Sequence, residues 1–170
     1  MQNEPMTKNS WITVAAILVV LVCLAAILRA QVVHPAISQY NHMRYIKTIQ
    51  SKAVSVEQKR KYLLSAFESD PLCNRVMLSL AQHYYIAEKD YVAAEKYLRL
   101  AMALYNGDLN AWSLYYLLGE LCLSRGDIPG AERAFRRSLY YFPRFEEAIG
   151  GLERVRKIKE QSDSVILRFR

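Results

Sequence analysis

A chain of 170 residues has room for one domain of ordinary size and one appendage. Its composition, 52% hydrophobic with 12 Tyr and only six Gly, argues against a turn-rich β-sandwich and favours a helical array. The net charge of +7 suits attraction to membrane head groups or nucleic acid, or simply a solvated surface with surplus Lys and Arg, and it specifies no fold.

The sequence contains no recognisable catalytic, cofactor or metal motif. GxSxG, a phosphate-binding loop, HExxH and CxxC are all missing. The histidines, His34, His42 and His83, have no partners at the spacing of metal ligands. Glu146 and Glu147 are adjacent on a predicted helix and point in different directions, so they do not form a shared-proton pair. We therefore expect no enzyme activity, no cofactor, no metal and no small-molecule substrate.

A short polar tail, residues 1–10, precedes a long apolar run. The 18 residues from Trp11 to Leu28 carry no charge, and as a helix they span about 27 Å, close to the hydrocarbon thickness of a bilayer. Trp11 suits one membrane interface and Arg29 marks the other. We predict a transmembrane helix over residues 11–30.

The alternative to an anchor is a cleavable signal peptide. Its cleavage site needs small residues, and the candidate site before Ala30 contains Arg29 instead. We therefore interpret the run as an uncleaved anchor. Ala15, Val22 and Ala26 share one helix face and permit close packing on a partner helix, although such a pattern often arises by chance.

Residues 31–54 connect the anchor to the rest of the chain. Pro35 should interrupt any helix that leaves the membrane. Beyond it, apolar residues recur at helical spacing, at Ile37, Tyr40, Met43 and Ile46. This pattern is compatible with a helix among the head groups, and a simple spacer is the other interpretation.

Helix-hairpin signals begin at Ser55, which forms a capping box with Gln58. The most regular stretch comes later and ends at Pro143, a residue that stops helices. Within it, Gly126 permits a turn and Asp127 can cap the following helix. The other marked positions are small residues expected on facing helices, Gly119 and Ala131, and residues of a buried layer, Leu118, Phe135 and Leu139.

This spacing resembles the tetratricopeptide repeat (TPR), a 34-residue helical hairpin. With Leu118 at position seven, Gly119, Gly126, Ala131, Phe135 and Pro143 take positions 8, 15, 20, 24 and 32. A weaker copy covers residues 74–106, with a turn that is one residue longer. Ala66 and Pro71 have the spacing of the second helix of a degenerate unit. The linker helix supplies the first helix of that unit, or that helix is absent.

A final helix after Pro143 has one apolar and one charged face, as expected of a cap on an open-ended array. Residues 161–170 then form a tail. The resemblance thus implies an all-α protein: an N-terminal transmembrane helix, a TPR-like domain of two to three hairpins over residues 55–160, and a C-terminal capping helix.

TPR arrays bind through the concave face made by the first helices of each unit, so the resemblance implies a binding groove on this chain. The corresponding positions are Arg75, Leu78, Gln82, Tyr85, Ile86, Ser113, Tyr116, Glu120, Leu123 and Ser124. This mixture suits an amphipathic helix or an extended peptide. It lacks the Lys, Asn and Arg of TPR domains that grip a terminal carboxylate. Some of these residues can instead pack internally.

We therefore expect a non-enzymatic, membrane-anchored scaffold or accessory subunit that binds a protein in an integral membrane complex. A chaperone-like module for exported or unfolded chains is the alternative. Electrostatic attachment to anionic lipid or nucleic acid ranks last, so no nucleic-acid partner is expected.

Two sequence signals disagree about the side of the membrane on which the array lies. Flanking charges, Arg29, Arg44 and Lys47 against Lys8, favour a cytoplasmic array. The layout resembles bacterial plasma-membrane proteins whose repeats lie outside the cytoplasm. On that resemblance we favour the extracytoplasmic side.

Overall fold

The computed structural model describes residues 8–49, 51, 53–105, 107 and 111–168, and these residues form helices and turns without a strand. The helices are α1 (Lys8–Leu28), η1 (Arg29–Val33), α2 (His34–Thr48), α3 (Val56–Ser69), α4 (Asn74–His83), η2 (Tyr84–Glu88), α5 (Tyr91–Ala103), α6 (Ala111–Ser124), α7 (Ile128–Tyr141) and α8 (Glu146–Arg168), where η marks a π-helical turn. The all-α prediction is confirmed.

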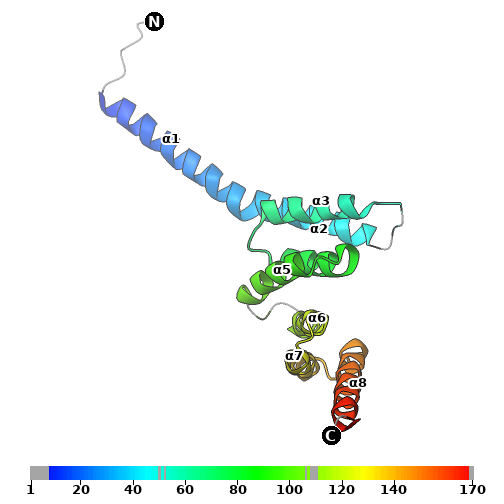
Figure 1. Ribbon diagram of the computed structural model, residues 1–170. Coiled ribbons are helices and arrows are strands. Elements are labelled where there is room, and N and C mark those ends of the chain that lie inside the picture. Colours follow the sequence, from blue (N-terminus) through cyan, green and yellow to red (C-terminus); the bar gives the residue numbers. More distant parts are fainter. Residues whose placement is uncertain (1–7, 50, 52, 106, 108–110, 169–170) are drawn as a thin grey trace, which may run out of the picture.

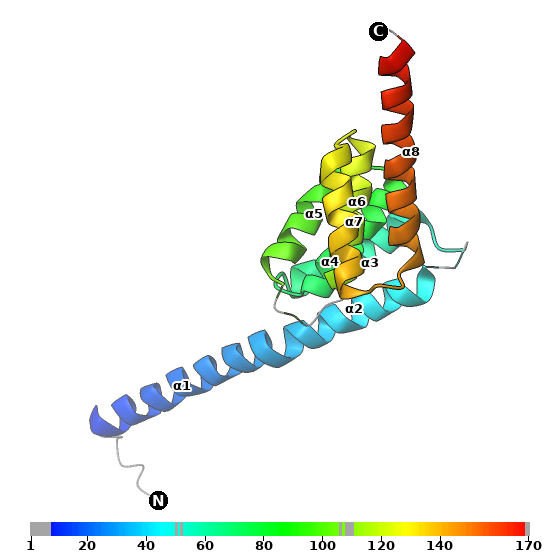
Figure 2. The same cartoon turned by 90° about the horizontal axis from the view of Figure 1, so that it is seen from below.

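Seven of these helices form a stacked array. Helices α2 and α3, α4 and α5, and α6 and α7 pair as three hairpins, and α8 packs on the last one. Figure 1 shows α2 and α3 lying across the view while α6 and α7 are seen end-on, so successive hairpins rotate about the axis of the array. Figure 2 shows α8 beside α7, with α1 projecting from the opposite end of the array.

Helix α1 continues into α2 as one rod (Figure 2). We expected Pro35 to interrupt it, and the structure corrects this. In a regular α-helix, Pro35 would lack one hydrogen bond and its ring would clash with a carbonyl one turn earlier. The π-helical turn η1 accommodates it: the His34 amide donates to the Arg29 carbonyl, five residues back, and the helix proceeds without a break.

The rod is fixed to helix α3 close to its proline. The Arg29 Nε donates to His34 Nε2 at 3.2 Å, and His34 Nδ1 lies 3.1 Å from the Ser69 carbonyl oxygen, which it can therefore donate to. Farther along, the Arg44 guanidinium lies 4.5 Å from the centre of the Tyr62 ring. The linker helix is thus the first helix of the first hairpin.

One face of α2 belongs to the protein core. Ser38 is 1% exposed and Tyr45 is 7% exposed, and the Tyr45 ring packs edge-on against His83 of α4 at 5.8 Å. His83 is itself buried, with its Nε2 3.2 Å from Glu88. This face of α2 therefore contacts protein and not lipid head groups.

The helix boundaries follow the local signals in the sequence. The Ser55 side chain accepts from the Gln58 amide, and the Asp127 side chain accepts from the Gly130 amide. Gly126 has φ +76°, a conformation that glycine adopts without strain. The preceding hairpin has a turn that is one residue longer than the repeat pattern. The π-helical turn η2 accommodates this residue, and Lys89 takes the left-handed conformation with φ 58°.

The Phe135 ring holds the C-terminal hairpin and the cap together. Phe135 is fully buried, and a Cβ on Gly119 of α6 or on Gly151 of α8 would lie 2.5 Å or 2.7 Å from its ring carbons. The ring therefore fits between two helices only because both neighbours are glycines. Ala131, the small residue expected opposite Gly119, is also fully buried.

Helix α8 is longer than the capping helix that we expected. Residues 161–168 continue it to Arg168 instead of forming a separate tail. Because an α-helix rises about 1.5 Å per residue, its 23 residues extend about 34 Å. The N-terminal residues 1–7 and the last two residues, 169–170, lie outside the described part of the chain.

The matched pair Gly151→Ala and Gly150→Ala tests the Phe135 contact. Both glycines lie in α8, but a Cβ on Gly150 meets nothing within 4 Å. We expect Gly151→Ala to lower the free energy of unfolding by about 1–3 kcal/mol through overpacking. Gly150→Ala should raise it by about 0.5–1 kcal/mol through helix propensity.

Urea unfolding of the full chain in mild detergent, followed by Trp112 fluorescence, measures both changes, because the Trp112 ring packs edge-on against Phe145, with the ring centres 4.5 Å apart, beside this contact. Equal effects of the two substitutions would contradict the proposed role of the glycines.

The Glu95 carboxylate predicts a pH dependence of stability. Hydrogen bonds from Arg125 and Arg99 hold its pKa at about 2, below the ordinary 4.5. Its contribution to stability is therefore fully present above pH 4.5 and is lost as the pH falls toward 2. We expect Glu95→Gln to cost about 1 kcal/mol or less near pH 7, because the arginines are largely exposed.

The difference between the wild type and Glu95→Gln should shrink toward zero between pH 4.5 and pH 2. Urea titrations at several pH values measure it, and a difference that stays constant with pH would refute the assignment.

Candidate functional site on the concave face

The first helices α2, α4, α6 and α8 form the face that the repeat pattern predicts for binding. In its middle, α4 and α6 contact each other through predicted groove residues. Gln82 donates to the Ser113 hydroxyl at 3.2 Å, and both Leu78 and Ser113 are less than one tenth exposed. These side chains join two hairpins, so they are largely engaged within the protein.

The C-terminal part of this face is closed by a polar cluster. Glu120 is 6% exposed, and its carboxylate accepts from the Tyr85 hydroxyl at 2.9 Å. The Arg154 guanidinium of α8 donates to both oxygens of the same carboxylate. Burial and the hydrogen bond to Glu120 raise the pKa of Tyr85, so this hydroxyl stays protonated and donates. The cap is thereby tied to both preceding hairpins.

The remaining predicted groove residues are not brought together. Arg75 is exposed at the start of α4, and Ile86 is 63% exposed in η2. Tyr116 and Leu123 are half-buried with the residues of the last hairpin and the cap, where the Tyr116 ring meets Phe145 at 5.1 Å. Ser124 is exposed and its hydroxyl donates to the Leu121 carbonyl at 2.8 Å.

A hollow of about 490 Å³ opens at the other end of this face, between α2 and α4. Its floor and walls are lined by Pro35, Ser38, Gln39, His42, Met43, Ile46, Asp70, Cys73, Asn74, Arg75 and Val76. Of the predicted groove residues, only Arg75 belongs to it. The cavity adjoins the rod, a few residues beyond the end of the apolar run.

Two polar side chains in this hollow have hydrogen-bond partners, and a third has none among the described residues. His42 Nε2 lies 2.8 Å from the Ser79 hydroxyl, and Asp70 accepts from the Leu72 amide at 3.2 Å. Burial and the nearby Arg75 charge lower the pKa of His42, so its ring is neutral at pH 7. The buried Ser38 hydroxyl has no partner among the described residues. The hollow thus contains hydrogen-bonding capacity that the fold does not use.

Sequence reasoning missed the α2 side of the hollow. The loop between α2 and α3, residues 49–55, is longer than the turns of the later hairpins, so counting back by the repeat period does not place α2 in register. The helical spacing of Met43 and Ile46 was the available signal. That spacing identifies a helix but not the face that it presents to α4.

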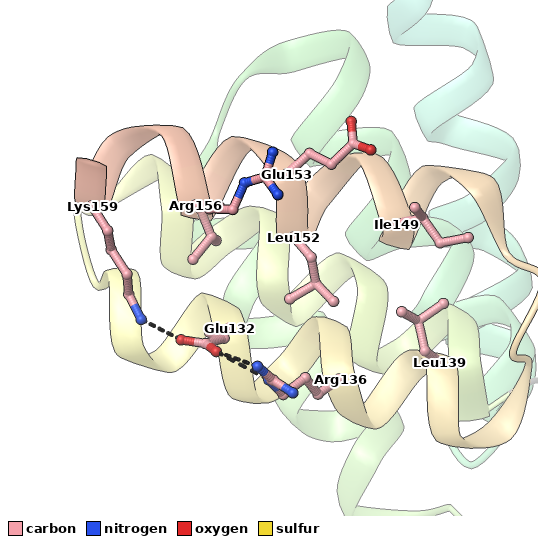
Figure 3. A pocket seen from close by; sticks show the side chains of 9 residues that line it. Glu132, Arg136, Leu139, Ile149, Leu152, Glu153, Arg156 and Lys159 are labelled. Atoms are coloured by element: carbon pink, nitrogen blue, oxygen red, sulfur yellow. Dashed lines mark hydrogen bonds and ion pairs between the residues drawn. The ribbon is translucent and has the colours of Figure 1, made fainter. Parts of the chain in front are cut away.

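A second hollow, of about 330 Å³, lies at the open end of the array between α7 and α8 (Figure 3). Leu139, Ile149 and Leu152 form its apolar floor. At its edge, Glu132 accepts from Lys159 and Arg136, as the dashed lines in Figure 3 show. A further hairpin of a longer array would cover this floor.

A third hollow, of about 350 Å³, lies between α6 and α7. At one side of it, the Arg137 guanidinium lies 5.5–5.7 Å from the centres of three tyrosine rings, Tyr115, Tyr140 and Tyr141. Among the described residues, no three His, Cys, Asp or Glu side chains gather as metal ligands.

Removal of the Arg154 side chain tests the polar cluster. We expect Arg154→Ala to lower the free energy of unfolding by about 1–3 kcal/mol, because the buried Glu120 carboxylate loses its countercharge. This loss is smaller than for a fully buried ion pair, because the arginine is half exposed and screened by water. In a Glu120→Gln background the same change should cost clearly less. Urea unfolding of the four proteins gives the coupling energy, and identical costs in both backgrounds would argue against the pair.

Comparisons with known proteins support the fold alone. No family model and no curated protein sequence matches this chain. Among solved structures, the first TPR domain of RPAP3 (Spaghetti) bound to the HSP90 peptide SRMEEVD has 17% identity and a TM-score of 0.64, covering 74% of this chain and 95% of that one.

The Arabidopsis OM64 TPR domain has 17% identity and a TM-score of 0.64, covering 73% of this chain and 98% of that one. The first TPR domain of human RPAP3 has 17% identity and a TM-score of 0.65, covering 76% and 98%. The described helices therefore have a TPR-like fold.

Proposed function

We propose that this chain is a non-enzymatic, single-pass membrane protein whose TPR-like array holds a protein partner beside the bilayer. The observation that carries the proposal is the continuous rod from the apolar run of α1 into the first hairpin. A chain organised in this way joins an anchor to an interaction domain with no flexible segment between them.

The apolar run supports the anchor because nothing in the described protein covers it. Every described side chain from Val14 to Leu28 is exposed, in a helix long and apolar enough to cross a membrane. In water, an exposed apolar surface of this length would favour aggregation. In a bilayer, the same side chains meet hydrocarbon, and the helical backbone satisfies its own hydrogen bonds.

The fold of the array and the hollow on its concave face support the proposal of a protein partner. A structural neighbour with the same fold is bound to a peptide. In this chain the concave face retains a hollow between α2 and α4, lined by the Ser38 hydroxyl, which has no hydrogen-bond partner among the described residues. At the positions of the terminal-carboxylate clamp stand Leu78, Gln82, Tyr116 and Glu120, and the last is already paired with Arg154. We infer binding of a partner segment by shape and mixed polarity.

For location we propose a bacterial plasma membrane with the array outside the cytoplasm, following the layout that the sequence resembles. Fusions of a periplasm-active reporter and a cytoplasm-active reporter after Arg168 test this orientation. Activity of the cytoplasmic reporter alone would reverse the assignment, in agreement with the flanking charges.

Purification of the full-length chain from its native membrane in mild detergent, followed by mass spectrometry, tests the function. We expect the chain to resist extraction by carbonate at pH 11 and to copurify with one membrane protein in constant ratio at high salt. A chain released by carbonate would refute the anchor. A varied set of substoichiometric clients would favour the chaperone-like alternative over a subunit.

A further inference from the structure

The hollow between α2 and α4 combines two independent groups of unused hydrogen-bond donors. The Ser38 hydroxyl is buried, lines the hollow and has no partner among the described residues. At the start of α4, Cys73 supplies no side-chain cap, and the amides of Asn74 and Arg75 meet no acceptor in the described protein. First-turn amides of this kind favour an acceptor that carries negative charge.

Among the charged side chains that line the hollow, Arg75 supplies the positive charge. The Arg75 side chain is exposed and has no carboxylate partner in the described residues. The other charged lining residue is Asp70, whose Oδ1 accepts from the Leu72 amide, and His42 is neutral at pH 7 and lies 2.8 Å from the Ser79 hydroxyl. A partner carboxylate in the hollow would therefore meet the Arg75 guanidinium and the first-turn amides of α4.

The hollow also has apolar lining residues on both helices. These are Pro35, Met43 and Ile46 on α2, and Val76 on α4. Met43 and Ile46 are about half exposed, so a partner side chain placed here would remove apolar surface from water. A segment that carries an apolar side chain close to a carboxylate matches both the donors and the apolar residues of the hollow.

The rod sets the height of the hollow above the bilayer. Along a continuous helix, Pro35 lies about 10 Å and Ile46 about 27 Å beyond Leu28, where the apolar run ends. The head-group layer is only about 6 Å thick on each side. Because η1 continues the helix and His34 joins it to α3, the array has no linker that would let the hollow reach distant proteins.

From these observations we propose that the α2–α4 hollow binds a membrane-proximal segment of an integral membrane protein, taking one apolar side chain and one adjacent carboxylate. This inference rests on the proposed membrane anchor. The anchor would hold the hollow at a fixed distance from the bilayer. The chain of any membrane protein that emerges on the same side crosses that distance close to its own membrane span. A free chain end or a soluble protein has no such constraint.

Site-specific photocrosslinking in the full chain, in its native membrane, tests the proposal. A photoreactive residue at Gln39, which is exposed and lines the hollow, is compared with one at Glu68, which is exposed on α3 and does not line it. We expect Gln39 alone to crosslink an integral membrane protein, at a peptide within about 20 residues of an apolar span.

A helical insertion tests the dependence on height. Seven Ala, Gln, Glu and Lys residues placed after Leu28 add nearly two full turns, so they raise the hollow by about 10 Å while preserving its direction. The crosslinked position should move about three to seven residues farther from the span, or the crosslink should be lost. An unchanged crosslinked position would overturn the proposal.

Two substitutions separate binding from folding. Ser38→Ala should leave the urea midpoint unchanged or higher, because no described residue pairs with the hydroxyl, and should lower the crosslink yield about threefold to fivefold. Arg75→Glu should lower the yield tenfold or more by placing like charges together. Unchanged yields in both variants would overturn the assignment, as would crosslinks to lipid or soluble proteins only.

The inference and the proposed function fail differently. If no membrane protein copurifies with the chain, the proposed function fails. If one copurifies but crosslinks equally well from Gln39 and Glu68, or only from another face, the function stands and the hollow is not its binding site.

Discussion

The continuous helix from α1 through η1 into α2 is the constraint on which the other features depend. Its backbone hydrogen bonds continue past Pro35 because one π-helical turn removes the clash that a regular helix would suffer. The His34 contact to Ser69 then joins the rod to the first hairpin. The apolar run and the helical array share one helix and cannot reorient independently, so the direction of the run determines the direction of the array.

The two ends of the array serve different purposes. At the C-terminal end, the Phe135 ring lies between Gly119 and Gly151, and the cap reaches back to Glu120 through Arg154. These contacts close the concave face and join the last hairpin to α8. At the N-terminal end, the face contains a hollow, and the Ser38 hydroxyl has no partner in the described part of the chain. An unsatisfied buried group costs stability, and such costs are typical of binding sites.

The composition of the hollow and the direction of the rod point to the same class of partner. The hollow offers amide and guanidinium donors beside apolar side chains, a combination that suits a protein segment better than a small molecule. The hollow lies only a few residues beyond the exposed apolar run, so with the proposed anchor that segment would lie close to the membrane. The polar cluster of Tyr85, Glu120 and Arg154, by contrast, is internally satisfied and acts as a connection between hairpins.

By itself the sequence determined the local features of this protein: the apolar run of α1, the caps at Ser55 and Asp127, the turn at Gly126 and the spacing of the last hairpin. Each depends on residues within a few positions of one another. Tertiary structure alone decided the helix face that α2 presents, the contact of Phe135 with Gly151, and the pairing of Arg154 with Glu120. These depend on how helices dock across loops of irregular length, which no local pattern encodes.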